Sequence, residues 1–282
     1  MSAVITREEA TKAPTGLQPP RKKRRWTSFV LPVYSALVIL YLILPILIMI
    51  LYGFNASGPK RVSFRWLGFS LYGYSHLFAK PDLTAALKNS LIIAVVSTII
   101  ATALGTLIAL ALVRYRFRAR TASDFVLFLN IAAPEIVLGA SLLSLFVTFG
   151  VPRGMGTIII SHVMFNIAYV TVTVRARLAG FDRHLEEAAQ DLGAGPWSTF
   201  LKVTLPLIWP GVLAGGLLAF ALSIDDFVIT NFNAGTAQTF PLWVYGAVKV
   251  GIPPQVFVMG TLIFAVGVLI AVVNVFAQRR KA

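Results

Sequence analysis

Six apolar stretches, each close to or beyond the length that crosses a lipid bilayer, constrain the fold of this chain most strongly. A transmembrane helix needs about 20 predominantly apolar residues. Only 13% of the residues are charged, about half the share of a soluble domain. A membrane β-barrel would show short alternating segments instead. The pattern therefore predicts an all-α, polytopic membrane protein with six transmembrane helices, near residues 29–52, 88–113, 124–149, 156–176, 208–230 and 256–276.

The basic residues predict the orientation of these helices. With both chain ends inside, the cytoplasmic segments hold most of the 25 Lys and Arg residues. Cytoplasmic loops typically carry such an excess, so we predict an N-in, C-in topology. The net charge of +14 has this explanation and does not indicate a nucleic-acid partner. We interpret residues 1–28 as a disordered basic cytoplasmic tail and residues 29–278 as the membrane domain, in contact with the lipid bilayer.

The residue types exclude several kinds of catalytic and metal chemistry. The chain has no cysteine, which rules out disulfides and thiolate sites. Its three histidines are far apart in the sequence, without metal-ligand spacing, and no phosphate-binding glycine loop occurs. No nucleophile and base are arranged as in an enzyme. We therefore expect no catalytic residue, no metal site and no cofactor bound by this chain.

The loop between the fourth and fifth apolar stretches is predicted to contain two short helices. Asp182 is placed to cap the first helix, and Gly193 suits the left-handed position that ends it. Pro196 suits the first turn of the second helix. Positions i, i+3, i+4 and i+7 of the first helix form one apolar face, made by Leu185, Ala188, Ala189 and Leu192.

This first helix has the features of a docking element. Small side chains permit close backbone approach, so the helix can enter a groove of another protein, and Glu187 would cap or ion-pair there. The alternative, a helix lying on the membrane, calls for bulky apolar residues opposite a basic face. Acidic residues beside an anionic leaflet favour docking. We predict that the loop, 177–206, couples the chain to a cytoplasmic partner through Leu185, Glu187, Ala188, Ala189, Asp191, Leu192 and Gly193.

Three acidic residues, Glu135, Asp225 and Asp226, fall inside apolar stretches. An ionised group near the bilayer centre costs roughly 2.5–3.5 kcal/mol even on lenient scales. From the helical rise, Glu135 lies roughly 16 Å beyond Asp124, and Asp225 lies roughly 21 Å beyond Gly211. All three are candidates for lining a substrate path.

Each acid also has a structural alternative. The aspartates could mark the outer end of the fifth stretch, and Glu135 could satisfy backbone freed by Pro134. Neighbouring residues of a helix point about 100° apart. We therefore expect one aspartate to face the path and the other to pair with a helix end, a partner chain or Lys249.

The run Glu187-Ala188-Ala189, followed by Gly193 and Pro206, resembles the EAA loop of ABC importer permeases. The resemblance covers nearly all residues from 30 to 278. Relatives often carry Asp where this chain has Glu135, and the basic tail is longer than expected. Four further runs are most similar to the second permease subunit of spermidine/putrescine importers, at residues 114–118, 133–137, 223–227 and 248–251.

The resemblance implies a type I ABC importer permease fold, a multi-pass place in the bacterial plasma (inner) membrane and a polyamine substrate. It implies that the loop inserts into an ATP-hydrolysing subunit. Two such subunits would hold ATP and Mg. It also implies a second, different permease chain and an extracytoplasmic substrate-binding protein. Gly211 and Gly215 suit close helix packing, either with that second chain or within this one.

Two alternatives remain open at the level of the sequence. The substrate of such an importer could be another small amine, an opine-like compound or a chelated metal. An ion-coupled secondary transporter would show inverted repeats. Residues 29–149 and 156–276 show no such symmetry, so this second reading is disfavoured.

Overall fold

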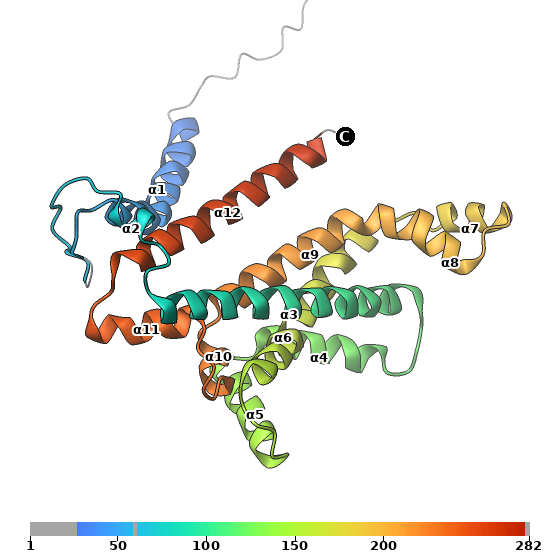
Figure 1. The fold of residues 1–282 in the computed structure, drawn as a ribbon. Coiled ribbons are helices and arrows are strands. Elements are labelled where there is room, and N and C mark those ends of the chain that lie inside the picture. The colour runs from blue at the N-terminus through green and yellow to red at the C-terminus, as the bar shows by residue number, and fades with distance from the viewer. Residues whose placement is uncertain (1–26, 59–60, 280–282) are drawn as a thin grey trace, which may run out of the picture. The chain divides into compact units, whose positions relative to one another are not determined.

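The computed structural model describes residues 27–58 and 61–279, and these residues are almost entirely helical (Figure 1). Within these ranges no strand forms, and the only β-type pairing is an isolated bridge between Asn55 and Phe69. The all-α prediction is confirmed. The helices are α1 (Thr27–Gly53), α2 (Tyr72–Ser75), α3 (Pro81–Arg114), α4 (Arg120–Ala132), α5 (Glu135–Thr148), α6 (Met155–Leu178), α7 (His184–Asp191), α8 (Pro196–Thr199), the π-helix η1 (Phe200–Thr204), α9 (Leu205–Asp225), α10 (Val228–Asn233), α11 (Phe240–Val250) and α12 (Pro254–Arg279).

The chain divides into two units, residues 1–48 and 49–282. Most of α1 belongs to the first unit, and its segment Phe29–Gly53 has a mean hydropathy of 2.7, the highest of the candidate spans. Most of the predicted basic tail lies outside the described residues. The helix bundle and the site described below belong to the second unit.

By length and composition, four of the described helical segments can cross a membrane, or five if one bent pair counts as a span. The bent pair is α4 and α5, and the helix axis bends by 110° at the break between them. The apolar part of α12 that the structure describes, Pro254–Ile270, is shorter than a full span. The count of six spans and the N-in, C-in topology therefore stay predictions.

Two predicted stretches differ from the helices observed. The stretch 124–149 is not one straight helix, because Pro134 lacks the N–H that would continue the helical hydrogen bonds and holds an extended backbone. The prediction of one continuous helix over residues 208–230 was also wrong. The helix ends at Asp225, Asp226 is extended, and α10 begins at Val228. Both breaks interrupt apolar runs whose hydropathy alone gave no sign of an end.

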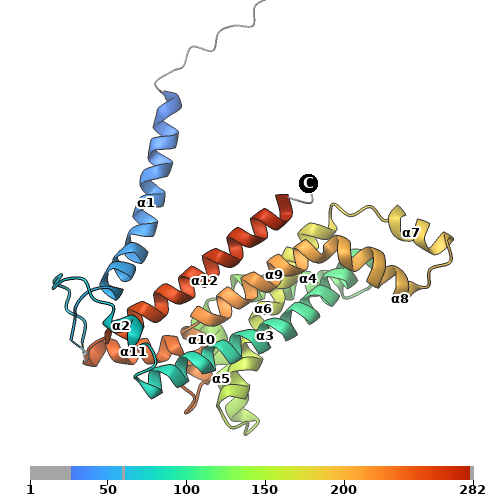
Figure 2. The ribbon, with the colours of Figure 1, turned by 45° about the horizontal axis from the view of Figure 1, so that its top comes forward.

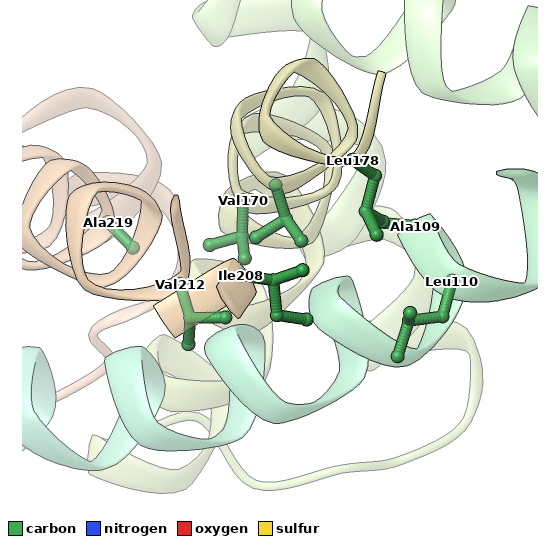
Figure 3. Close-up of a cluster of buried hydrophobic side chains, with 8 residues drawn as sticks. Ala109, Leu110, Val170, Leu178, Ile208, Val212 and Ala219 are labelled. Carbon is green, nitrogen blue, oxygen red and sulfur yellow. The ribbon is translucent and has the colours of Figure 1, made fainter. Parts of the chain in front are cut away.

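The three helices α3, α6 and α9 pack against one another and carry the main apolar core, shown in Figure 3. Because lipid tails are as apolar as these side chains, van der Waals packing between the helices stabilises the bundle inside the membrane. The helices α7 and α8 extend from one end of this bundle (Figure 1, Figure 2). The core side chains are Ala109 and Leu110 of α3, Val170, Val174 and Leu178 of α6, and Ile208, Val212 and Ala219 of α9.

Glycines let these helices approach closely. A Cβ atom added at Gly211 would lie 2.6 Å from the Cβ of Arg177 on α6, and one at Gly215 would lie 3.4 Å from the Cα of Val170. Packing within this chain, the second of the two sequence-based explanations, therefore accounts for both glycines.

Replacing Gly105 by Ala should destabilise the bundle. The new Cβ would lie 2.8 Å from the Cβ of Val170, a stiff β-branched neighbour, and overpacking of this kind costs about 1–3 kcal/mol. Thermal unfolding in detergent measures the effect. The matched control is Gly246→Ala, where nothing lies within 4 Å and the gain in helix propensity should be neutral or stabilising. Equal unfolding temperatures for the two variants would contradict the expectation.

Candidate functional site

The two helix breaks lie beside one cavity of about 280 Å³. Helices α5 and α10, which follow the breaks, pack against each other. An added Cβ at Gly139 of α5 would lie 2.7 Å from the Phe232 ring of α10. The cavity is bordered by Glu135, Asp225 and Asp226 together with Asn130, Phe165, Tyr169 and Phe227, among others. The structure thus brings Glu135 together with Asp225 and Asp226, which the sequence placed in a different stretch.

Glu135 is the first residue of α5, directly after Pro134, and it is exposed. A carboxylate at a helix N-terminus is stabilised by the unpaired N–H groups and the helix dipole. Asp225 is the last residue of α9 and is also exposed in this chain. Both side chains are therefore open to a solute in the cavity.

Asp226 differs from its neighbour because its carboxylate has partners within the protein. Its Oδ2 atom accepts hydrogen bonds from the backbone N–H and the hydroxyl of Thr230, both at 2.7 Å. The side chain is only 7% exposed. Asp226 thus pairs with the beginning of α10, one of the three partners expected, and holds the chain at the break while Asp225 faces the cavity.

His162 is a buried residue that the sequence reasoning missed. Its ring is 1% exposed, with Nε2 3.2 Å from Oδ2 of Asp226 and 2.9 Å from the Thr230 hydroxyl. Its Nδ1 lies 2.6 Å from the hydroxyl of Ser223, which in turn lies 3.0 Å from that of Ser97. The ring therefore links α6 to α3, α9 and α10. His162 lies inside the apolar stretch 156–176, and an ionisable group in such a stretch is a functional candidate, as the three acids are.

Replacing His162 by Ala should lower the free energy of unfolding by about 3–5 kcal/mol, because the buried Asp226 carboxylate loses the ring that pairs with it. The double variant His162→Ala with Asp226→Asn should recover part of this loss, since no charge is left buried. Thermal unfolding of these two variants and of Asp226→Asn alone measures the coupling. His76→Ala, at an exposed ring stacked on Tyr72, is the control and should stay near the parent protein. Simple additivity of the two changes would contradict the expected coupling.

The predicted docking loop forms the two short helices expected. The Asp182 carboxylate accepts a hydrogen bond of 3.0 Å from the His184 N–H at the start of α7. Gly193 is left-handed with a φ of +87°, and Pro196 begins α8. In the described chain α7 buries none of its residues.

An apolar surface runs along this loop. Leu192 is 90% exposed and Trp197 is 71% exposed, while Leu185 is about half exposed. Of the other residues predicted to dock, Ala188, Asp191 and Gly193 are exposed and Ala189 is partly buried.

The two neighbouring glutamates of α7 have different surroundings. Glu187 is 65% exposed, with its Oε2 atom 3.0 Å from Nδ1 of His184. Glu186 is turned toward the bundle, where it accepts hydrogen bonds from Arg114 and Thr204. Sequence reasoning identified Glu187 alone, since a pattern within the loop carries no sign of Arg114, 72 residues away.

In the described part of the chain, no group of three or more His, Cys, Asp or Glu side chains is placed to hold a metal ion. The arrangement is instead that of a cavity bordered by carboxylates and aromatic rings, in a helix bundle from which the exposed helix α7 extends. These features define a multi-pass helical transport component of a membrane.

Comparison with known proteins gives the family. Residues 101–281 match the model of the binding-protein-dependent transport system inner membrane component. The chain belongs to this family, and the predicted location in the inner membrane is confirmed.

Two relatives cover most of the chain. The spermidine/putrescine transport system permease protein PotC of Escherichia coli K12 is 39% identical over 242 residues, which are 86% of this chain and 90% of PotC. The putrescine transport system permease protein PotI of the same strain is 41% identical over 238 residues, 81% of this chain and 84% of PotI. The predicted resemblance to polyamine permeases is confirmed.

A solved structure shows the same fold. The crystal structure of a bacterial alginate ABC transporter in complex with an alginate pentasaccharide-bound periplasmic protein contains a chain that aligns with a TM-score of 0.65 at 16% identity. The alignment covers 92% of this chain and 96% of that one. The predicted ABC importer permease fold is confirmed.

Proposed function

We propose that this chain is a permease subunit of an ATP-driven ABC importer for polyamines such as spermidine and putrescine. It forms half of the channel and supplies no catalytic residue or cofactor. A second, different permease chain forms the other half, and two ATP-binding subunits hold ATP and Mg. An extracytoplasmic binding protein delivers the substrate. The observation that carries the proposal is the similarity to two polyamine permeases over more than 80% of each chain.

The chemistry of the cavity supports a cationic substrate. A polyamine is a flexible chain of ammonium groups separated by methylenes. Glu135 and Asp225 can replace the hydration of successive ammonium groups. The rings of Phe165, Tyr169 and Phe227 add cation–π attraction of about 0.5–2 kcal/mol each. Because these groups are spaced around an open cavity, they assist passage without holding the substrate permanently.

The exposed surface of α7 supports coupling to an ATP-binding subunit. Leu185 and Leu192 provide apolar side chains for a groove, while Ala188 and Ala189 allow the helix to approach closely. Glu187 is placed to pair with a basic group of that subunit, and Gly193 ends the helix so that the loop can turn back. Asp191, at the last turn of α7, adds a second exposed carboxylate.

Reconstitution tests the proposal. The chain is purified with its second permease, ATP-binding subunits and binding protein, and inserted into liposomes. The expected result is ATP-dependent uptake of labelled spermidine and putrescine, absent when the ATP-binding subunits are left out. Uptake of another small amine or a chelated metal in place of polyamines would move the assignment to another substrate. Uptake driven by an ion gradient without ATP would overturn it.

A further inference from the structure

The three side chains Arg114, Glu186 and Thr204 form a closed triangle of polar contacts where α7 meets the helix bundle. Arg114 donates through Nη2 to Oε1 of Glu186 and, at 3.1 Å, to the hydroxyl of Thr204. The Thr204 hydroxyl donates to the same Oε1 atom of Glu186. Each residue therefore contacts the other two, although they lie on three separate helical segments.

These groups are shielded from solvent. Thr204 is fully buried, and the side chains of Arg114 and Glu186 are 22% and 12% exposed. A partly buried ion pair is screened by salt much less than a surface pair. Two further contacts to Thr204 restrict the rotamers of Arg114 and Glu186. The contacts of the triangle thus hold its three side chains in one arrangement, unlike the exposed pair that Glu187 makes with His184.

The helices on either side of the triangle give it a mechanical role. Arg114 is the last residue of α3, and Thr204 ends η1 and leads directly into α9. Helices α3 and α9 share the buried core beside this point, with Leu110 and Ile208 among its members. Because α7 itself buries no residue, the triangle attaches an exposed helix to the buried core of the bundle.

From this geometry we propose that Glu186 is a positioning residue for energy coupling. Through Arg114 and Thr204 it fixes α7 to the ends of α3 and α9, so that a displacement of α7 moves both helices together. The proposal rests on the proposed function of the chain. The segment η1 fits this role, since π-turns within helices occur frequently at functional sites.

Neighbouring glutamates then divide two tasks. Glu187 points outward and contributes to binding the ATP-hydrolysing partner. Glu186 points inward and contributes to passing on the movement of that partner. The variants Glu186→Gln and Glu187→Gln remove the same charge at adjacent positions, and they are therefore a matched pair.

The test measures both variants in the full reconstituted complex. For Glu186→Gln, we expect the ATP-binding subunits to copurify within twofold of the parent amount, while spermidine taken up per ATP hydrolysed falls at least fivefold. For Glu187→Gln, copurification itself should fall. Loss of copurification and uptake in parallel for Glu186→Gln would overturn the proposal, and so would an unchanged ratio of uptake to hydrolysis.

A charge reversal separates positioning from general damage to the fold. Arg114→Glu and Glu186→Arg should each lower the amount of spermidine taken up per ATP hydrolysed. The double variant should recover at least half of the parent value. The Thr204 hydroxyl can donate to either carboxylate and accept from either guanidinium. Thr204→Val, which keeps the shape of the side chain, should give an intermediate loss. A double variant no better than the worse single one would argue against the triangle.

Hydrogen exchange in the full chain gives a readout that does not depend on transport. The amides of residues 184–191 should exchange at least tenfold faster in Glu186→Gln than in Glu187→Gln, while those of α9 stay protected. Equal exchange in both variants would overturn the positioning role. Absence of ATP-dependent polyamine uptake by the parent complex would instead overturn the proposed function, and the exchange data would still decide the role of Glu186.

Discussion

Replacing Asp225 by Asn should lower spermidine uptake by at least tenfold. Asp225 is an exposed carboxylate on the cavity, and Asn keeps its size while removing the charge. Hydrogen bonds to charged groups are worth about 1.5–3 kcal/mol, and each 1.4 kcal/mol corresponds to about a factor of ten. Initial rates of labelled uptake into liposomes, over a range of concentrations, measure the change. Basal ATP hydrolysis should stay near the parent value.

Three comparisons sharpen this prediction. Asp225→Glu keeps the charge and should retain most of the uptake. Spermidine, with three ammonium groups, should lose more than putrescine, with two. Asp226→Asn should act mainly on stability, because that carboxylate is bonded to Thr230 and His162. If Asp225→Asn and Asp225→Glu lost uptake equally, the carboxylate would have a structural role in place of a role in the path.

Local signals allowed the ends of the short helices α7 and α8 to be predicted closely. Asp182, Gly193 and Pro196 act through contacts within a few residues, and each has the predicted role in the structure. Helix capping and left-handed glycine depend on short-range backbone geometry, so a sequence pattern is sufficient to locate them. The helix break at Pro134 also has a local cause, the missing N–H, although the stretch 124–149 was predicted as a single span.

The ring that pairs with Asp226 and the guanidinium that pairs with Glu186 could not be predicted from the sequence, because these contacts join residues far apart in the chain. At the helix break, the buried Asp226 carboxylate also pairs with His162, which lies 64 residues earlier in the chain, and the apolar run continues beyond the break. Glu186 takes its role from Arg114, 72 residues away. The intramembrane acids were identified from their cost of burial alone. Their meeting in one cavity required both helix breaks to be placed side by side.

Contacts in the fold also decide which of the two neighbouring aspartates faces the cavity. Helical geometry predicts that adjacent side chains diverge, but it does not say which of them faces the cavity. Burial of Asp226 against Thr230 decides this, because a carboxylate held by the Thr230 N–H and by the His162 ring is less available to a passing cation. The cavity therefore offers Asp225 and Glu135 as its accessible charges among the described residues that border it.

Reversing the charge of Glu187 should disconnect the chain from its ATP-binding subunits. Glu187 is exposed on α7 beside the apolar residues Leu185 and Leu192, so a docked subunit would cover it. Truncating one partner of a buried interfacial charge pair costs about 2–5 kcal/mol, and a reversed charge adds repulsion. We expect Glu187→Arg to reduce copurification of the ATP-binding subunits from membranes at least tenfold, with uptake falling to a similar extent.

His184→Ala provides the control for this experiment. It removes the ring that pairs with Glu187 inside the chain but leaves the carboxylate free to meet a partner. Copurification should therefore stay within about twofold of the parent, because an exposed pair contributes only about 0–1 kcal/mol. If His184→Ala reduced copurification as strongly as Glu187→Arg, the pair would act by shaping α7. If both variants left copurification and uptake unchanged, α7 would not be the docking surface, and coupling would have to run through another part of the chain.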